Sequence, residues 1–233
     1  MFFPLYYFAD WTMLLLIPGL IFGIWAENKI RRTSRYYSRI STQGGLSGAR
    51  VAQLMLRANG VDNVRVELVG NSAELSDHYD PRNHVLRLSD GVYNSTSITA
   101  VGIAAHEVGH AYQHSDLYTP LNVRNAIAPV ASISSSLAIP LFLFGFFFAT
   151  PALVTVGIVL YMLAVFFQLV TLPVEFNASR RALAALESGG YMTAEELVGA
   201  KQVLNAAAMT YVAAALASTL QLLRLMLLGR RRR

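Results

Sequence analysis

Four long hydrophobic stretches divide the chain, and each has close to the roughly 20 apolar residues that a membrane-crossing helix needs. They cover about residues 5–26, 126–149, 152–172 and 205–228. Only Thr150-Pro151 separates the second stretch from the third, which predicts a tight hairpin of two helices. The hydrophobic pattern therefore predicts about four transmembrane helices.

The polar segment between the first two stretches has the pattern of a small α+β unit. Ser47 is placed to cap a short amphipathic helix that ends at Asn59-Gly60. Residues 64–68 and 85–88 alternate like half-buried strands. Hydroxyl and amide side chains at residues 94–97 then precede an apolar helix. We expect a mainly α membrane protein with a small α+β portion.

Composition supports the membrane assignment and narrows the chemistry. The chain is 54% hydrophobic and 14% charged, with a mean hydropathy of +0.42, which is too apolar for a soluble domain of this length. The absence of cysteine excludes disulfides, thiolate metal sites and cysteine nucleophiles. The net charge of +5 is concentrated beside the apolar stretches, at Lys29, Arg31, Arg32, Arg35, Arg39 and residues 230–233. This placement indicates anchoring at a lipid bilayer and no nucleic-acid partner.

The motif His106-Glu107-Val108-Gly109-His110 is typical of zinc hydrolases of the zincin type. Residues four apart in a helix lie on one face about 6 Å apart, so both imidazoles can bind a single ion. Glu107 projects beside such an ion and can act as general base on a zinc-bound water. Gly109 removes a side chain between the ligands, which we expect to let the metal or a substrate backbone come close.

A catalytic zinc site needs a third protein ligand, and Glu175 is the best candidate. It follows the predicted hairpin, so it emerges on the same side of the bilayer as His106 and His110. The competing interpretation is a carboxylate that merely favours a helix N-terminus. His114 lies about 12 Å along the helix from His106 and cannot reach the ion, while His78 and His84 are expected in a loop or an edge strand.

Three motifs together carry a family resemblance that covers nearly the whole chain. The histidine motif, the block at residues 77–81 and the block at residues 172–179 resemble the YugP-like family of membrane-bound neutral zinc metallopeptidases. More distantly, the chain is similar to the HtpX-type gluzincin peptidases, whose third ligand opens a Glu-x-x-Ala-Asp motif. The resemblance implies that Glu175 is that ligand, that Ala178 is the alanine and that Zn²⁺ is the cofactor.

The chain departs from the wider family at Ser179, where that family has aspartate. Such an aspartate typically accepts a hydrogen bond from a liganding histidine. Asp77, Asp80 and Asp116 are alternative partners between which the sequence does not choose.

These observations predict five segments and one activity. The segments are a first span (1–26), a zincin-like catalytic segment (27–125), a transmembrane hairpin (126–173), a third-ligand helix and loop (174–202), and a last span with a basic tail (203–233). We expect a membrane-embedded, zinc-dependent endopeptidase whose metal ligands are His106, His110 and Glu175 and whose catalytic base is Glu107. Its substrate would be a protein or peptide, with membrane proteins favoured by the apolar surroundings.

Several points stay open in the sequence. The hairpin at residues 75–88 is a candidate edge for pairing with substrate, and Tyr79, His78, Asn177 and Arg180 are all candidates for stabilising the oxyanion. The oligomeric state and cleavage specificity are not encoded in any motif.

Two other functions compete with the peptidase. A site-2-type intramembrane protease would carry the histidine motif inside a transmembrane helix, but the apolar run before His106 covers only residues 98–105. A non-catalytic membrane scaffold or metal-binding regulator would have no need of Glu107, which is intact.

Charge placement predicts the orientation in a bacterial plasma membrane. The basic residues after the first stretch predict an outside amino terminus and a zinc site that faces the cytoplasm. Arg180, Arg181 and Lys201 fall on the same side as that cluster, whereas the arginines at 230–233 oppose it.

Overall fold

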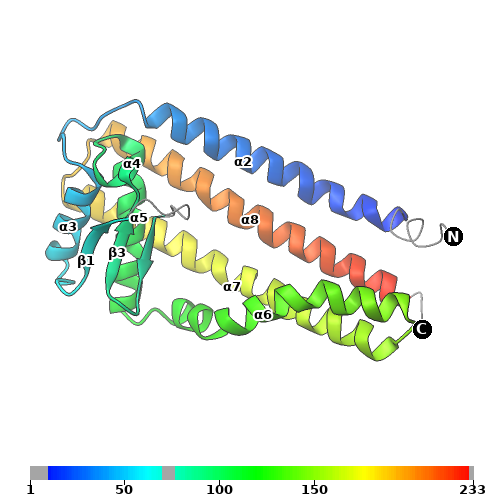
Figure 1. Ribbon diagram of the computed structural model, residues 1–233. Coiled ribbons are helices and arrows are strands. Elements are labelled where there is room, and N and C mark those ends of the chain that lie inside the picture. Colours follow the sequence, from blue (N-terminus) through cyan, green and yellow to red (C-terminus); the bar gives the residue numbers. More distant parts are fainter. Residues whose placement is uncertain (1–9, 70–76, 231–233) are drawn as a thin grey trace. The chain divides into compact units, whose positions relative to one another are not determined.

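The computed structural model describes residues 10–69 and 77–230 of the chain. Its elements, in order, are η1 (Trp11–Leu16, a 3-10 helix), α2 (Ile17–Tyr37), α3 (Gly48–Ala58), β1 (Arg65–Leu68), β2 (His78–Asp80), β3 (Val85–Leu88), α4 (Asp90–Tyr93), α5 (Ile98–Ser115), α6 (Thr119–Phe147), α7 (Pro151–Ser188) and α8 (Ala194–Arg230) (Figure 1). The prediction of a mainly α protein with a small α+β portion is confirmed. Parts of three predicted features lie outside the described residues: residues 5–9 of the first stretch, 75–76 of the hairpin and 231–233 of the tail.

The chain forms two compact units. Within the described residues, the helical unit comprises 10–27, Val123–Leu172 and 209–230. The α+β unit comprises Asn28–Asn122 and Pro173–Ala208, so it combines segments from both sides of the predicted transmembrane hairpin.

The sheet of the α+β unit has the strand order β1-β3-β2. β3 pairs in parallel with β1 and antiparallel with β2. Leu86 and Leu88 of the central strand are fully buried, as expected for a strand covered on its apolar face. The short strand β2 lies within the hairpin expected at residues 75–88, and it ends in a turn where Asp80 accepts the N–H groups of Arg82 and Asn83.

Helices α3 and α5 pack together in the core of this unit. As the sequence predicts, Ser47 caps α3 by accepting the Arg50 N–H. Of the candidate caps at residues 94–97, Ser97 is the one that caps α5, by accepting the Ala100 N–H. Met55 of α3 is fully buried, and its carbonyl accepts a 2.6 Å hydrogen bond from the Tyr112 hydroxyl of α5. The helix that carries the histidine motif is therefore packed and hydrogen-bonded against α3 in the core.

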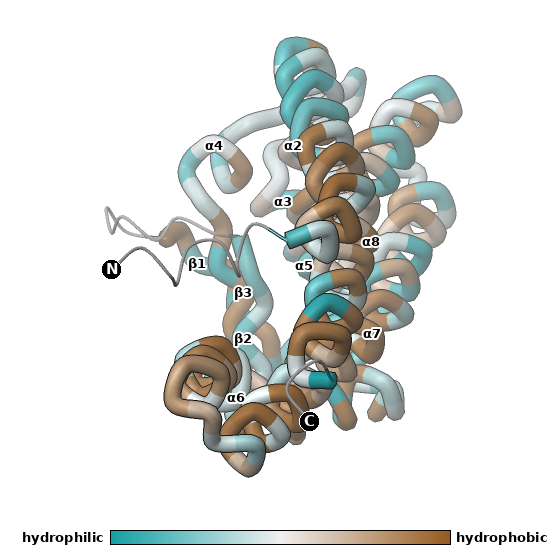
Figure 2. The backbone as a smooth tube through the Cα atoms, turned by 90° about the vertical axis from the view of Figure 1, so that its right-hand side faces the viewer, coloured by the Kyte–Doolittle hydropathy of each residue, from teal (hydrophilic) through white to brown (hydrophobic). Residues whose placement is uncertain are grey.

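Four helical stretches of the described chain are long and apolar enough to cross a membrane: Trp11–Tyr37, Thr119–Phe147, Pro151–Ser188 and Ala194–Arg230. This number confirms the prediction of about four spans. Figure 2 shows hydrophobic residues gathered along α6, α7 and α8. The α5 helix, which carries the histidine motif, is not among these stretches.

The predicted hairpin is formed by α6 and α7. Ala149 turns the chain with a positive φ of 51°. A Cβ on Gly157 would lie 2.7 Å from the backbone nitrogen of Phe142, so the glycine allows the two helices to touch. α6 begins at Thr119, several residues before the predicted start of the second stretch.

The α7 helix differs from the sequence interpretation near Glu175. The interpretation that competes with a metal ligand, a carboxylate favoured by a helix N-terminus, requires a new helix to begin at Glu175. Instead, α7 continues without interruption through Pro173 to Ser188. Glu175 therefore lies in the interior of a long helix, where no free N-terminus favours its charge.

Candidate metal centre

The α5 helix presents His106 and His110 one turn apart on the same face. Their rings are 4.8 Å apart between centroids and nearly perpendicular. Both side chains are mostly buried, with 15% and 12% of their surfaces exposed. This arrangement follows directly from the helical spacing of the motif.

Glu175 reaches the two imidazoles from α7. Its Oε2 lies 3.3 Å from Nε2 of His106 and 3.7 Å from Nε2 of His110. The three donor atoms all lie within 4.8 Å of one another, and Glu175 is only 2% exposed. Among the described residues, these three side chains form a candidate metal site.

The donor set matches zinc in its chemistry, and the two distances from Glu175 match its spacing. Two imidazoles and one carboxylate are a common protein ligand set for catalytic zinc, which keeps a fourth position open. Donors on a tetrahedral zinc with bonds of about 2.0–2.1 Å lie about 3.3–3.4 Å apart. The observed separations from Glu175 differ from that value by a few tenths of an ångström at most.

Gly109 allows α5 and α7 to approach closely enough for this contact. A Cβ at this position would clash with the carbonyl oxygen of Ala178 and would lie 3.0 Å from its carbonyl carbon. Ala178 itself is fully buried. The glycine therefore accommodates the helix that carries Glu175, rather than the metal or a substrate backbone as the sequence suggested.

Ser179 takes the place of the aspartate found in the wider family. Its Oγ lies 3.1 Å from Nδ1 of His106, so a neutral hydroxyl can hold the imidazole with Nε2 directed at the metal position.

The three aspartates considered as substitutes are engaged elsewhere. Asp77 accepts hydrogen bonds from Ser89, Asp80 pairs with Arg87, and Asp116 pairs with Arg181. Ser179 is thus the side chain that contacts Nδ1 of His106.

Gln113 orients the second histidine, and sequence reasoning missed it. Its Oε1 lies 3.0 Å from Nδ1 of His110. Its Nε2 donates to the Val174 carbonyl at 2.8 Å and to Oδ1 of Asn177 at 3.0 Å. Because both of those partners are acceptors, the amide can only present its oxygen to His110, which must then carry its proton on Nδ1.

This hydrogen-bond chain extends to the surface. Arg181 donates from Nε to Asn177 at 2.9 Å and forms an ion pair with Asp116. Gln113 is fully buried, and one side chain therefore links a predicted ligand on α5 to the backbone beside the predicted ligand on α7. The spacing of Gln113, three residues after His110 on the same helix face, was the available sequence signal.

Glu107 lies beside the candidate metal site and outside its ligand group. Its carboxylate accepts the backbone N–H of Tyr79 in β2 at 3.1 Å, and the side chain is buried. Burial raises the pKa of Glu107, while His106 and His110 oppose the rise. A raised carboxylate pKa makes the group a stronger proton acceptor in its ionised form.

The remaining histidines do not join this group. The hydroxyl of Tyr79 lies 2.9 Å from Nδ1 of His114, whose ring also packs 5.5 Å from that of His84. His78 lies in β2, an edge strand, as anticipated. Of the four candidates for oxyanion stabilisation, Asn177 is occupied by Gln113 and Arg181, and the Tyr79 hydroxyl contacts His114.

Residues 12–230 match the family described as "Putative neutral zinc metallopeptidase". The chain belongs to this family. It is also 45% identical over 214 residues to "Putative membrane protease YugP" of Bacillus subtilis (strain 168), a match that covers 92% of this chain and 94% of that protein. No solved structure matches the chain.

Membership confirms the resemblance drawn from the three motifs, and it confirms zinc as the expected metal. The match spans both units and all four candidate membrane helices. The family relationship therefore includes the membrane helices as well as the α+β unit.

Proposed function

We propose that this protein is a membrane-embedded zinc endopeptidase. His106, His110 and Glu175 hold the metal, and Glu107 is the general base. The observation that carries the proposal is the meeting of three donors from two helices within 4.8 Å of one another, with the buried carboxylate of Glu107 beside them. The two orienting contacts from Ser179 and Gln113 support it, because metal-binding histidines usually donate their second N–H to a fixed partner.

Zinc in this position would lower the pKa of a water molecule to about 7 and polarise the substrate carbonyl. A side chain of the protein transfers the proton. Glu107 accepts a proton from the water and then donates it to the nitrogen of the leaving amine, which balances the hydrolysis of one peptide bond. The Tyr79 N–H holds this carboxylate in place throughout.

The edge strand β2 supports a peptide as substrate. Its inner edge pairs with β3, and its Tyr79 N–H is directed at Glu107. An extended peptide that pairs with β2 would therefore run beside the general base. The apolar helices favour membrane proteins, or their exposed ends, as substrates.

Casein hydrolysis tests the activity. Wild-type protein should cleave casein, a zinc chelator should abolish cleavage, and added zinc should restore it. Glu107→Gln should bind zinc normally and lose at least 10²-fold in rate, because glutamine has nearly the same shape but cannot accept the proton. A zinc-loaded, folded wild type that cleaves neither casein nor other unfolded proteins would favour the non-catalytic scaffold or regulator.

We further propose that the amino terminus lies outside a bacterial plasma membrane and that the metal site faces the cytoplasm. The basic residues Lys29, Arg31, Arg32 and Arg35 lie at the end of the first candidate span and should remain inside. Reporter fusions after Lys29 and after Arg233 test this. A periplasmic signal from the fusion after Lys29 would show that the orientation is reversed.

A further inference from the structure

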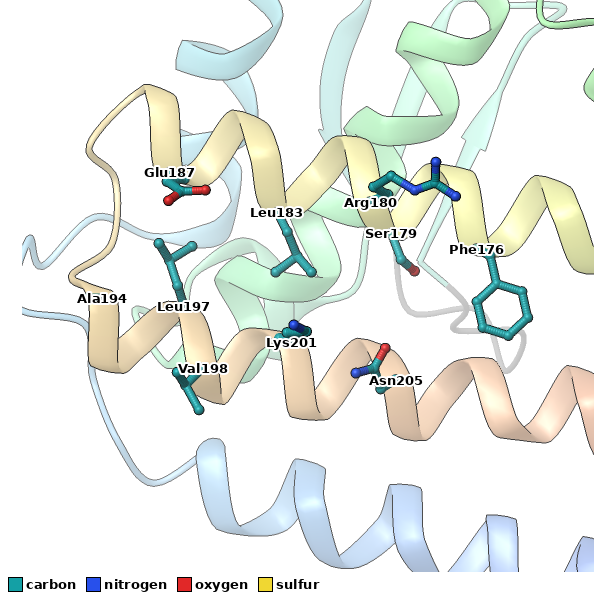
Figure 3. Close-up of a pocket in the computed structure, with 10 residues that line it drawn as sticks. All are labelled: Phe176, Ser179, Arg180, Leu183, Glu187, Ala194, Leu197, Val198, Lys201 and Asn205. Atoms are coloured by element: carbon teal, nitrogen blue, oxygen red, sulfur yellow. The ribbon is translucent and has the colours of Figure 1, made fainter.

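A groove runs between α7 and α8 within the α+β unit (Figure 3). Its volume is about 580 Å³, within the range of about 300–1,000 Å³ that is typical of ligand sites. Its apolar wall consists of Phe176, Leu183, Leu197 and Val198. The groove is open to solvent, since Phe176 is 37% and Val198 is 55% exposed.

Ser179 connects this groove to the candidate metal centre. The same side chain lines the groove and contacts His106, one of the predicted zinc ligands. A molecule in the groove would thus lie one side chain away from a ligand of the reacting centre. Arg180, one of the candidates for the oxyanion, also lines the groove.

The charges in the groove are unevenly distributed along its length. Arg180 follows Ser179 directly, and Lys201 lines the groove from α8, whereas the acidic Glu187 lies two turns farther along α7. Both cations are exposed, and neither forms an ion pair within residues 10–69 and 77–230. Arg180 therefore places a positive charge next to Ser179, and Lys201 adds a second one farther along the groove, opposite Leu183 (Figure 3).

The length of the groove suits a short piece of extended peptide. A helix rises 1.5 Å per residue, so Ser179 and Glu187 are about 12 Å apart along α7. Extended chain advances about 3.3 Å per residue, so this distance accommodates about three or four residues. Arg180 would face a residue close to the cleaved bond, and Glu187 would face one near the far end.

We propose that this groove binds the peptide substrate on one side of the cleaved bond and prefers an apolar segment with a carboxylate within about two residues of that bond. Arg180 binds the carboxylate at the end of the groove next to Ser179, and Lys201 adds a second positive charge farther along. An acidic side chain and a free carboxyl terminus offer the same chemistry. This inference rests on the proposed peptidase function.

Quenched fluorescent peptides test the preference. A single Glu is moved through the three positions on each side of the cleaved bond in an apolar host peptide, and each Glu peptide has a matched Gln peptide. Amidated and free carboxyl termini separate the two sources of carboxylate. Binding is measured by fluorescence anisotropy on the Glu107→Gln protein, and kcat/KM is measured on protein with Glu107 intact.

The test variant is Arg180→Ala with Lys201→Ala. Its matched control is Arg50→Ala with Arg57→Ala, which removes the same charge from exposed positions on α3. We expect the test variant to bind the best Glu peptide about tenfold more weakly and the Gln peptide unchanged, with a difference that shrinks at high salt. The control should behave like the parent protein.

Three outcomes would overturn the proposal: no difference between Glu and Gln peptides, equal weakening of both in the test variant, or an effect that depends only on phosphatidylglycerol in the surrounding bilayer. The last outcome would indicate a lipid headgroup as the ligand. Hydrolysis without any charge preference would leave the peptidase function standing and remove the groove as its acid-binding subsite. Charge-dependent binding without hydrolysis would support the groove as an acid-binding site and contradict the peptidase function.

Discussion

Replacing Gln113 with leucine should weaken both the fold and metal binding, because this amide makes three hydrogen bonds from a fully buried position. Leucine has a similar size, so the loss of stability comes mainly from the missing hydrogen bonds. Each buried hydrogen bond contributes about 0.5–1.5 kcal/mol, and we therefore expect the free energy of unfolding to fall by about 2–4 kcal/mol.

The effect on zinc follows from the proton on His110. With Gln113 present, Nδ1 of His110 donates to Oε1 and Nε2 stays unprotonated towards the metal position. Without that acceptor the ring can rotate or exchange its tautomer. Loss of such an orienting partner typically lowers metal affinity about 10–100-fold.

The assay separates these two effects. Zinc affinity is measured by competition with a fluorescent chelator, and stability is measured by denaturation of the zinc-free protein. Gln113→Glu should lose stability like Gln113→Leu, because a carboxylate cannot donate to the Val174 carbonyl, yet it should retain more zinc affinity since it still accepts from His110. Gln43→Leu, at an exposed position where only the backbone N–H is hydrogen-bonded within the described part of the chain, is the matched control.

The reasoning would be refuted if Gln113→Leu bound zinc as tightly as the wild type while remaining folded. It would also fail if Gln113→Glu and Gln113→Leu lost the same amount of zinc affinity, since the acceptor on His110 would then have no special role.

Three further predictions concern the same site. Glu175→Ala should sharply reduce the zinc found by elemental analysis, whereas Glu187→Ala, on the same helix but outside the site, should retain it. Gly109→Ala should displace α7 from α5 at Ala178 and lower both stability, by about 1–3 kcal/mol, and zinc content; Gly91→Ala, where a Cβ meets nothing within 4 Å, should leave the zinc content unchanged. Removing zinc should lower the unfolding free energy by about 2.7 kcal/mol relative to protein at a free zinc concentration 100 times its dissociation constant, and an unchanged thermal midpoint would contradict specific binding to the folded state.

Local patterns in the sequence determined much of this protein. The spacing of His106 and His110 depends only on helix geometry, so their shared face could be predicted without any knowledge of packing. The Ser47 and Ser97 caps are equally local, because each contact spans only three residues. The candidate membrane spans follow from long apolar stretches, which are the strongest signal that a sequence carries.

The tertiary structure decided what depends on two helices meeting. Glu175 was a sequence candidate, but only packing could show that its carboxylate lies 3.3 Å from Nε2 of His106. The sequence suggested that Gly109 makes room for the metal or a substrate backbone. Its neighbour in the fold is Ala178, which is far away in the sequence, so the close approach of the two helices could not be predicted. The contacts of Ser179 and Gln113 were hidden for the same reason: a side-chain hydrogen bond between helices has no periodic signature, since it is determined by the positions of both backbones at once.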